Sequence, residues 1–410
     1  PLRRQRQMCI RDRIAITPIR KSRSRMRILQ IAKHFDPDFG GIETVTKDLS
    51  EGFAAEGIQA DVLCTEFAPP YGPFSGPYKV IRAKSDFDLG NKRISLDYVR
   101  RIAKLEPDYD VAIVHMPNPL AVAGVLRGWR KPFVLLWHAD TPQKAIRLLF
   151  GQFDRKAIKA AAGIIAPTSV HIARSHFCRD FEAHSDTHIV PLPFDPNRLP
   201  PPDLNSDFVK EVETFARGRK IVLSTGRMVP YKGYDVLVDA ATRTSDSAVF
   251  VIVGDGPVRE QIKPAVRQKA LEEKVMLPGR ISDHDLSGVL ELCHVGCMPS
   301  ITAAEMYGLA QVEAMSRGKP VISTDLPRSG VPFVNRHGET GLLAKPGDPI
   351  SLARCIDLLT SDEELYRKLS AGASQAFENE HCLKAVIEQY VAILKPIIAK
   401  SLQTEDAIPA

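Results

Sequence analysis

Short apolar segments and amphipathic segments alternate along most of the chain. Residues 27–33 are largely apolar, a Gly-Gly pair follows, and residues 43–56 repeat apolar side chains at helical spacing up to Gly57. Further apolar runs of strand length are separated by helical stretches such as 96–105. Alternating strands and helices predict a parallel sheet with helices on both faces. The strands expected in this first half are 27–33, 61–64, 78–82, 111–115, 133–137, 163–166 and 188–190.

A proline-rich stretch separates this half from a second one of the same kind. Residues 191–202 contain six prolines, too many for a helix or a central strand, so they are expected to form a linker. The predicted fold class is α/β, with two Rossmann-like domains facing each other across a cleft and the last helix packing back toward the first domain. In the second half we expect strands at 220–224, 249–253, 275–277, 295–298, 320–323 and 341–343, and helices at 236–241, 286–292, 309–317, 351–360, 363–379 and 384–399.

The pattern divides the chain into five segments. Residues 1–25 show no sustained apolar period and are expected to lie outside the fold, as an extraneous or disordered basic leader. The remaining segments are expected to be a first Rossmann-like domain over 26–195, a linker over 196–205, a second Rossmann-like domain over 206–383, and a crossing helix and tail over 384–410.

The positive charge of the chain is concentrated in this leader. The net charge is +6, but residues 1–25 hold nine Lys or Arg against one Asp, so residues 26–410 carry about −2. A nucleic-acid-binding protein needs basic residues clustered on its folded body, so we expect no nucleic-acid partner. A basic nucleic-acid-binding arm is the alternative interpretation of the leader itself.

Neither the apolar runs nor the cysteines indicate a membrane-spanning or secreted protein. Runs such as 111–114 are far shorter than the roughly 20 residues of a membrane-spanning helix. The seven cysteines are scattered and odd in number, which suits a reduced compartment better than a disulfide framework. We therefore expect a water-soluble, cytoplasmic protein with buried thiols.

The loop after the predicted strand 220–224 carries two cations. Ligands of open α/β sheets bind outside the carboxyl ends of strands, and here Arg227 and Lys232 lie between Gly226 and Gly233. A planar guanidinium and an ammonium point charge together suit a diphosphate. Taken alone, the pair also fits two solvated surface charges.

Residues 299–315 follow another predicted strand and carry two carboxylates. A helix is expected to begin near Gly308, with Glu305 in the loop before it and Glu313 one to two turns inside it. Backbone N–H groups of Gly308 and Leu309 would face an anionic phosphate, and a carboxylate at Glu313 would accept from ribose hydroxyls. The alternative is a helix-start carboxylate and a solvated helical Glu.

Together these motifs resemble the family-4 retaining glycosyltransferases of the GT-B fold, over about residues 26–390. The resemblance rests on Glu305 and Glu313 with seven residues between them, on the glycines and cations of 226–233, and on Gly40-Gly41. Segments 115–120, 137–140 and 330–335 are similar to the polysaccharide-synthesis mannosyltransferase-like members. The resemblance implies transfer of a hexose, with mannose as one candidate, from a nucleoside diphosphate sugar to a glycan or lipid-linked acceptor. It also implies retention of the anomeric configuration, no metal ion, no cofactor, and an acceptor-binding first domain beside a nucleotide-sugar-binding second domain.

The resemblance implies a role for each site residue. Arg227 and Lys232 would hold the diphosphate and Glu313 the ribose. Glu305 and His138 would be the catalytic residues beside the donor sugar. His115 ends a similar strand and is a weaker candidate, and a structural histidine is the alternative for both rings. The other expected donor-binding residues are Gly40, Gly41, Arg280, Met306, Tyr307, Gly308 and Leu309, although Phe is common in the family where Met306-Tyr307 stands.

Three other functions fit the sequence less well. A nicotinamide-dependent oxidoreductase would show a complete Gly-x-Gly-x-x-Gly, but the Gly-x-Gly of 254–256 is followed by Pro-Val-Arg. The acidic pairs of 36–38 and 283–285 do not follow buried strands as the metal-binding acids of other glycosyltransferases do. A non-transferase of the same fold, such as a sugar-nucleotide epimerase, is the closest alternative.

Residues 143–159 mix basic and apolar side chains at helical spacing. Such a helix can lie on an anionic membrane near a lipid-linked acceptor, which would make the protein peripheral on the inner face of the plasma membrane. An ordinary amphipathic core helix has the same pattern.

Overall fold

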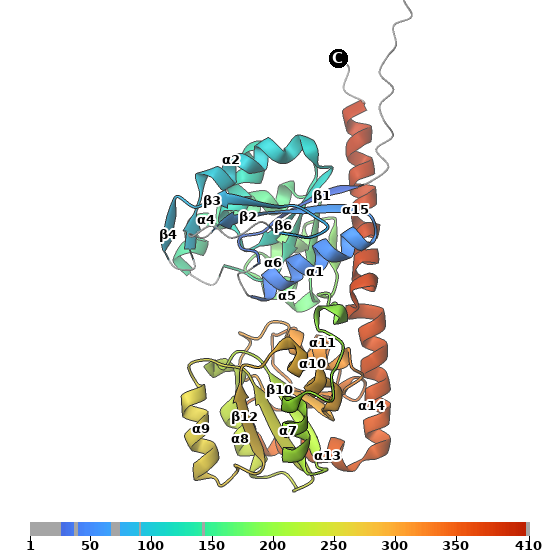
Figure 1. The fold of residues 1–410 in the computed structure, drawn as a ribbon. Coiled ribbons are helices and arrows are strands. Elements are labelled where there is room, and N and C mark those ends of the chain that lie inside the picture. The colour runs from blue at the N-terminus through green and yellow to red at the C-terminus, as the bar shows by residue number, and fades with distance from the viewer. Residues whose placement is uncertain (1–25, 37–39, 67–73, 90–91, 142–143, 407–410) are drawn as a thin grey trace, which may run out of the picture.

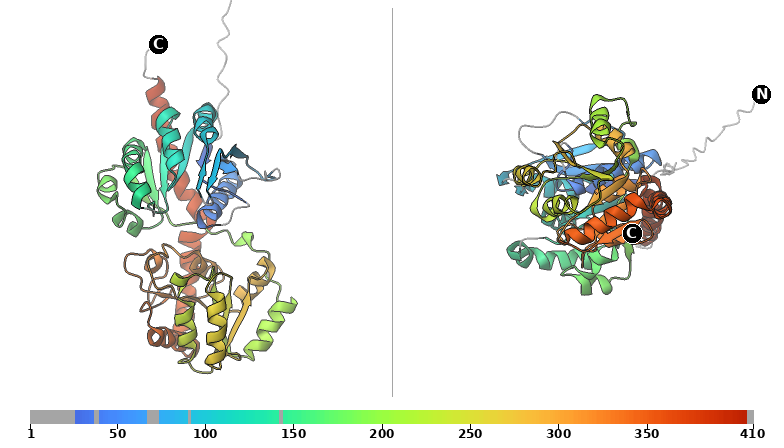
Figure 2. Two further views of the ribbon diagram at one scale, coloured as in Figure 1. Left: turned by 90° about the vertical axis from the view of Figure 1, so that its left-hand side faces the viewer. Right: turned by 90° about the horizontal axis from the view of Figure 1, so that it is seen from below.

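The computed structural model describes residues 26–36, 40–66, 74–89, 92–141 and 144–406. They form two α/β halves stacked along the length of the molecule (Figure 1). Each half is built around a parallel sheet, and helices pack on both of its sides (Figure 2). The predicted fold class, two Rossmann-like domains with a helix packed back on the first, is confirmed. The predicted leader lies outside the described residues.

The first sheet has seven parallel strands in the order β3-β2-β1-β6-β7-β8-β9. Its strands are β1 Arg27–Ile31, β2 Gln59–Glu66, β3 Val80–Lys84, β6 Val111–Met116, β7 Phe133–Trp137, β8 Gly163–Ala166 and β9 Thr187–Ile189. Its helices are α1 Gly41–Ala55, α2 Leu96–Leu105, α3 Pro119–Gly128, α4 Lys144–Ala160, α5 Ser169–Ala173 and α6 Cys178–Glu182. The central strands β6 and β7 are buried throughout, which explains why they are continuous apolar runs.

The second sheet has six parallel strands in the order β12-β11-β10-β13-β14-β15. Its strands are β10 Lys220–Thr225, β11 Ala248–Val253, β12 Val275–Gly279, β13 Val295–Met298, β14 Val321–Thr324 and β15 Gly341–Ala344. Its helices are α7 Asp207–Ala216, α8 Tyr234–Ala241, α9 Arg259–Gln268, α10 Asp283–Leu292, α11 Leu309–Met315, α12 Val331–Val334, α13 Pro349–Ser361 and α14 Glu363–Ala376. Both sheets therefore present loops at the carboxyl ends of central strands, where a ligand of this fold class binds.

The chain returns from the second domain to the first through one long helical segment. After α14 it makes a π-helical turn at Phe377–His381 and continues as α15, Leu383–Asp406, beside α1 (Figure 1). Phe53 of α1 and Tyr390 of α15 pack edge to face with ring centroids 6.0 Å apart. The backbone N–H of Phe194 donates to the carbonyl of His381 at 2.9 Å. The two segments that connect the domains, the proline-rich stretch and the π-helical turn, therefore lie side by side.

The differences from the predicted elements have local causes. The predicted helix 363–379 ends at Ala376 because the π-helical turn replaces its last residues. The predicted helix 384–399 continues to Asp406 through Pro396, because buried Tyr390 and Leu394 already anchor it to the first domain. The antiparallel pair β4 Phe87–Leu89 and β5 Lys92–Ile94 was not predicted, since three-residue strands have too short a pattern.

Candidate functional site

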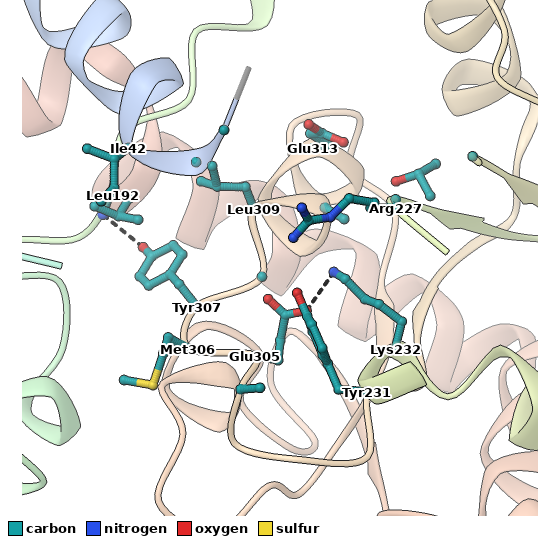
Figure 3. Close-up of a pocket in the computed structure, with 18 of the residues that line it drawn as sticks. Ile42, Leu192, Arg227, Tyr231, Lys232, Glu305, Met306, Tyr307, Leu309 and Glu313 are labelled. Atoms are coloured by element: carbon teal, nitrogen blue, oxygen red, sulfur yellow. Dashed lines mark hydrogen bonds and ion pairs between the residues drawn. The ribbon is translucent and has the colours of Figure 1, made fainter. Parts of the chain in front are cut away.

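A cleft of about 690 Å³ lies between the two domains. Gly40, Gly41 and His138 line it from the first domain, and loops after β10, β12 and β13 line it from the second. Ten of its lining residues are labelled in Figure 3. Apart from the weaker candidate His115, every residue that the sequence predicts for the site lines this cleft: Gly40, Gly41, His138, Arg227, Lys232, Arg280, Glu305, Met306, Tyr307, Gly308, Leu309 and Glu313. His115 does not line the cleft, but its ring contacts the ring of His138.

Lys232 lies at the end of a short helical turn, Pro230–Lys232, that follows β10. Gly233 ends this turn with φ of 68°, and a Cβ atom there would lie 2.2 Å from the carbonyl oxygen of Pro299, so the position requires glycine. The backbone N–H of Ile301 donates to the Tyr231 carbonyl at 2.8 Å. These contacts hold the loop after β10 against the loop after β13.

This packing brings together a cation and a carboxylate that the sequence predicted separately. The Nζ of Lys232 lies 2.5 Å from Oε2 of Glu305, and the Ser300 hydroxyl donates to the same oxygen at 3.2 Å. The Lys232 side chain is only 13% exposed, so it is not a solvated surface charge. Arg227 is exposed, has no side-chain hydrogen bond or ion pair among the described residues, and points toward the same region (Figure 3).

The backbone of the Glu305 loop is fixed by its neighbours. The Ser329 hydroxyl donates to the Glu305 carbonyl at 2.5 Å, and the Gly330 N–H donates to the Met306 carbonyl at 2.9 Å. Gly308 has φ of 78°, and α11 begins at the next residue, as the sequence predicted. Glu305 therefore stands before the helix and Glu313 inside it.

Glu313 forms an ion pair with Arg198, which lies in the proline-rich linker between the domains. Arg198 donates to Oε1 of Glu313 at 3.3 Å and to Oδ2 of Asp48 on α1 at 3.2 Å. Burial raises the pKa of Glu313, and the charges of Arg198 and Lys232 oppose this shift. Burial likewise raises the pKa of Asp48 to about 7, again opposed by Arg198. One guanidinium thus connects α1 of the first domain to α11 of the second.

His138 belongs to a buried polar group under the first-domain side of the cleft. Its Nε2 lies 3.1 Å from Nδ1 of His115, whose Nε2 lies 2.9 Å from Oε1 of Gln30. Burial lowers the pKa of His115 to about 3 and holds the pKa of His138 well below its ordinary value. Both rings are therefore neutral near pH 7.

Tyr307 lines the cleft, but its hydroxyl is directed to the linker (Figure 3). It accepts a hydrogen bond from the Leu192 backbone N–H at 3.0 Å and lies 3.0 Å from Nδ1 of His381. The hydroxyl that distinguishes this residue from Phe thus joins the second domain to both segments that connect the domains. It does not face Arg227 and Lys232.

The sequence interpretation missed several lining residues. His171 lines the cleft, accepts or donates a hydrogen bond with Thr168 at 2.8 Å, and has a pKa lowered by burial to about 4. It comes shortly after β8, so the rule that sites lie beyond the carboxyl ends of strands could have indicated it. Ile42, Pro167, Leu192, Tyr231 and Asp283 also line the cleft.

The acidic residues of 36–38 and 283–285 that the structure describes include two whose carboxylates contact cationic or hydroxyl side chains. Asp36 pairs with Lys47 at 3.5 Å, whereas Asp38 is outside the described residues. Asp285 accepts hydrogen bonds from Ser206 and Ser282. Across the described part of the chain, no group of three or more His, Cys, Asp or Glu has an arrangement suited to a metal ion.

Helix α4 exposes apolar side chains next to basic ones. Leu148 is 83% exposed and Leu149 68%, and Arg155, Lys156 and Lys159 are exposed on the same helix. Its buried face carries Ala157 and Ile158, so the apolar residues lie on two sides and are not all core. Among the helices of the described residues, none is long and apolar enough to span a membrane.

Two family models match the chain. The model described as Glycosyltransferase Family 4 matches residues 39–198, and the model described as Glycosyl transferases group 1 matches residues 205–376. The first match falls on the first domain and the second match on the second, so together they cover most of the chain.

Relatives and solved structures of known proteins extend over nearly the same length. The O-antigen chain mannosyltransferase C of Escherichia coli is 26% identical over 385 residues, 90% of this chain and 99% of the relative. A D-rhamnosyltransferase of Pseudomonas aeruginosa is 28% identical over 363 residues, 86% of this chain and 92% of the relative. The structure of Anabaena Alr3699/HepE in complex with UDP has a TM-score of 0.72 at 20% identity, covering 90% of this chain and 100% of that one.

Proposed function

Because the chain belongs to glycosyltransferase family 4, we propose that it moves a hexose from a nucleoside diphosphate sugar to a glycan or lipid-linked acceptor, with retention of the anomeric configuration and without a metal ion. The observation that carries this proposal is the convergence of Arg227, Lys232, Glu305 and Glu313 on one side of a cleft whose other side holds His138.

The chemistry of the leaving group explains why two cations stand at this site. When the bond from the sugar to the diphosphate breaks, negative charge grows on the diphosphate oxygens. Preorganised cations in a partly water-excluded cleft stabilise that charge. Lys232 is largely buried and Arg227 points toward the same region, so they can supply the charge that a divalent ion supplies elsewhere.

The remaining side chains suit the other parts of the ligand. Glu313 carries carboxylate oxygens that accept from the two ribose hydroxyls. Glu305 adjoins Lys232, so it would accept hydrogen bonds from hydroxyls of the sugar attached to the diphosphate. His138, from the opposite domain, would contact the same sugar near the reacting carbon. Gly40 and Gly41, also cleft-lining, would let the backbone approach the ligand closely.

Mannose is the first candidate for the sugar. The E. coli relative is named a mannosyltransferase and the P. aeruginosa relative transfers rhamnose, and each matches most of this chain. Both are transferases, which favours transfer over the epimerase alternative. Cell-surface polysaccharide synthesis is the corresponding process.

The surface of α4 supports a membrane-associated acceptor. Exposed Leu148 and Leu149 beside basic side chains form the combination that binds the interface of an anionic membrane. We place the protein in the cytoplasm, bound reversibly to the inner face of the plasma membrane, where a lipid-linked acceptor would be within reach of the cleft.

A donor assay tests the proposal. The purified chain is incubated in EDTA with GDP-mannose, UDP-glucose and TDP-rhamnose, and with membranes of a polysaccharide-producing cell as the acceptor source. We expect nucleoside diphosphate release with one donor, transfer of its sugar, and an unchanged anomeric configuration in the product by NMR. Release of an altered free sugar without transfer would instead identify an epimerase, and no release with any donor would contradict the proposal.

A further inference from the structure

A row of buried side chains connects helix α1 to the His138 ring. Gln30 on β1, His115 on β6 and His138 directly after β7 come from three neighbouring strands. Gln30 is fully buried and His115 is 2% exposed. The contacts run from Oε1 of Gln30 to Nε2 of His115 at 2.9 Å, and from Nδ1 of His115 to Nε2 of His138 at 3.1 Å. The positions of the protons in this row decide what His138 presents to the cleft.

The first fixed point is the amide of Gln30. Its Nε2 lies 3.1 Å from the backbone carbonyl oxygen of Thr46 and 2.5 Å from the Ser50 hydroxyl. A carbonyl oxygen can only accept a hydrogen bond, so the amide nitrogen must face it. The reverse orientation would place two carbonyl oxygens against each other inside the protein. Oε1 of Gln30 therefore faces His115 and can only accept from it.

This orientation determines the tautomer of His115. Its Nε2 must carry the proton that Gln30 accepts. Because burial lowers the pKa of His115 to about 3, the ring is neutral and its Nδ1 has a free lone pair. Nδ1 of His115 is therefore a hydrogen-bond acceptor, and a neighbouring group must donate to it.

Two atoms lie within hydrogen-bond distance of that acceptor. The Thr46 hydroxyl is 3.2 Å from Nδ1 of His115 and has only one proton, which the carbonyl oxygen of Ile42 also accepts at 2.8 Å. Nε2 of His138 lies 3.1 Å from Nδ1 of His115, and two unprotonated nitrogens at this distance would set their lone pairs against each other, so Nε2 of His138 carries a proton. A neutral His138 with a proton on Nε2 has none on Nδ1, and no hydrogen bond of the described residues uses that atom.

We infer that the backbone carbonyl of Thr46 on α1 acts through Gln30 and His115 to fix His138 in its Nε2-protonated tautomer. Nδ1 of His138 is then an acceptor for a hydroxyl of a sugar bound in the cleft. Only the identity of that ligand rests on the proposed function. In this arrangement His138 is the catalytic residue, and Gln30 and His115 are positioning residues.

The tautomer has a chemical consequence for the reaction. A hydroxyl that donates its proton to an imidazole nitrogen becomes more electron-rich at oxygen. Beside a sugar carbon that gains positive charge as the diphosphate leaves, such an oxygen is stabilising. The opposite tautomer would present an N–H donor to the same hydroxyl and would draw electron density away from it.

The first test reads the tautomer in the unmodified protein. Protein labelled with ¹⁵N at histidine is studied near pH 7 by two-bond ¹H–¹⁵N correlation, which distinguishes protonated from unprotonated ring nitrogens, and the His138 signals are assigned from His138→Asn. We expect His138 with a proton on Nε2 and none on Nδ1. A proton on Nδ1 of His138 would overturn the inference. This measurement needs no substrate, so it stands even if the protein transfers no sugar.

The second test reverses the row at its start. In Gln30→Glu the side chain has no N–H for Thr46, and its charge favours a doubly protonated His115 whose Nδ1–H then donates to His138. We expect the His138 proton to move to Nδ1, and kcat to fall about 10- to 100-fold while the donor KM changes less than about 3-fold. Gln261→Glu makes the same change on the exposed face of α9 and is the matched control. An unchanged His138 tautomer in folded Gln30→Glu would show that α1 does not set it.

Discussion

Lys232 and Glu305 form an ion pair in the cleft, with 2.5 Å between Nζ and Oε2. They come from the loops after β10 and β13, which are adjacent strands of the second sheet. The cation proposed for the diphosphate is therefore held by the carboxylate proposed for the donor sugar. The diphosphate and the sugar of one ligand would meet at this pair.

In the absence of metal ions, removing the charge of Lys232 or Arg227 should weaken the binding of a nucleoside diphosphate. A hydrogen bond to a charged group contributes about 1.5–3 kcal/mol, so Lys232→Gln and Arg227→Gln should each raise Kd roughly 10- to 100-fold. Isothermal titration calorimetry in EDTA measures the change. Lys156→Gln, an exposed cation of α4, is the control and should bind as the wild type does. A Kd within about 2-fold of wild type in Lys232→Gln would remove this residue from the diphosphate site.

Glu313 should affect the affinity for a nucleotide only through the ribose hydroxyls. Glu313→Gln is expected to weaken binding of the preferred nucleoside diphosphate about 10-fold, because a neutral amide is a weaker acceptor than a carboxylate. The 2′,3′-dideoxy form of the same nucleotide has no hydroxyls to donate, so it should bind wild type and Glu313→Gln with equal affinity. If the substitution weakens both nucleotides to the same extent, Glu313 does not contact the ribose.

Asp48 should make stability depend on pH. Its pKa in the folded protein is about 7, raised from 3.8 chiefly by burial, so folding favours the protonated form. The contribution of this group is fully present below pH 3.8 and is lost as the pH rises through 7. Between pH 5 and pH 8 the loss amounts to about 2–3 kcal/mol at 1.36 kcal/mol per pKa unit.

The variant Asp48→Asn isolates this contribution. Its free energy of unfolding should fall less than that of wild type between pH 5 and pH 8, by about the same 2–3 kcal/mol. Urea unfolding at the two pH values gives both numbers. Equal pH dependence in wild type and Asp48→Asn would mean that Asp48 is ionised throughout this range.

The exposed leucines of α4 should carry the proposed membrane binding. Leu148→Glu combined with Leu149→Glu removes two apolar side chains, each worth about 1.5–3 kcal/mol when buried, and adds negative charge. Flotation with anionic liposomes at low salt should lose at least 10-fold of the bound protein. Leu358→Glu, on α13 of the second domain and 49% exposed, is the matched control. Retained binding by the double variant would place the contact elsewhere.

The strands and the second-domain site were predictable because their signals are local. Arg227, Lys232 and Glu305 each follow a strongly apolar strand, and the rule that ligands bind beyond the carboxyl ends of strands brings such loops together. Glu313 could be placed because its spacing from Gly308 puts it inside the following helix. Their pairing distances depend on loop packing, which no spacing determines.

Other contacts depend on long-range packing and left no local signal. Gln30 lies between apolar Leu29 and Ile31 of β1, so its hydrogen bonds to α1 could not be inferred from its neighbours. Arg198 lies in the proline-rich linker, and only the folded chain shows that it reaches both Asp48 and Glu313. The Tyr307 hydroxyl likewise finds Leu192 and His381 only once the domains are assembled.

The most direct test of a nucleoside diphosphate site in the cleft is calorimetric titration of the purified protein with GDP, UDP, ADP and TDP in EDTA. We expect one of them to bind at a ratio of one to one, with unchanged affinity when magnesium is added. No binding of any of the four, or binding only in the presence of magnesium, would contradict a diphosphate site formed by Arg227 and Lys232.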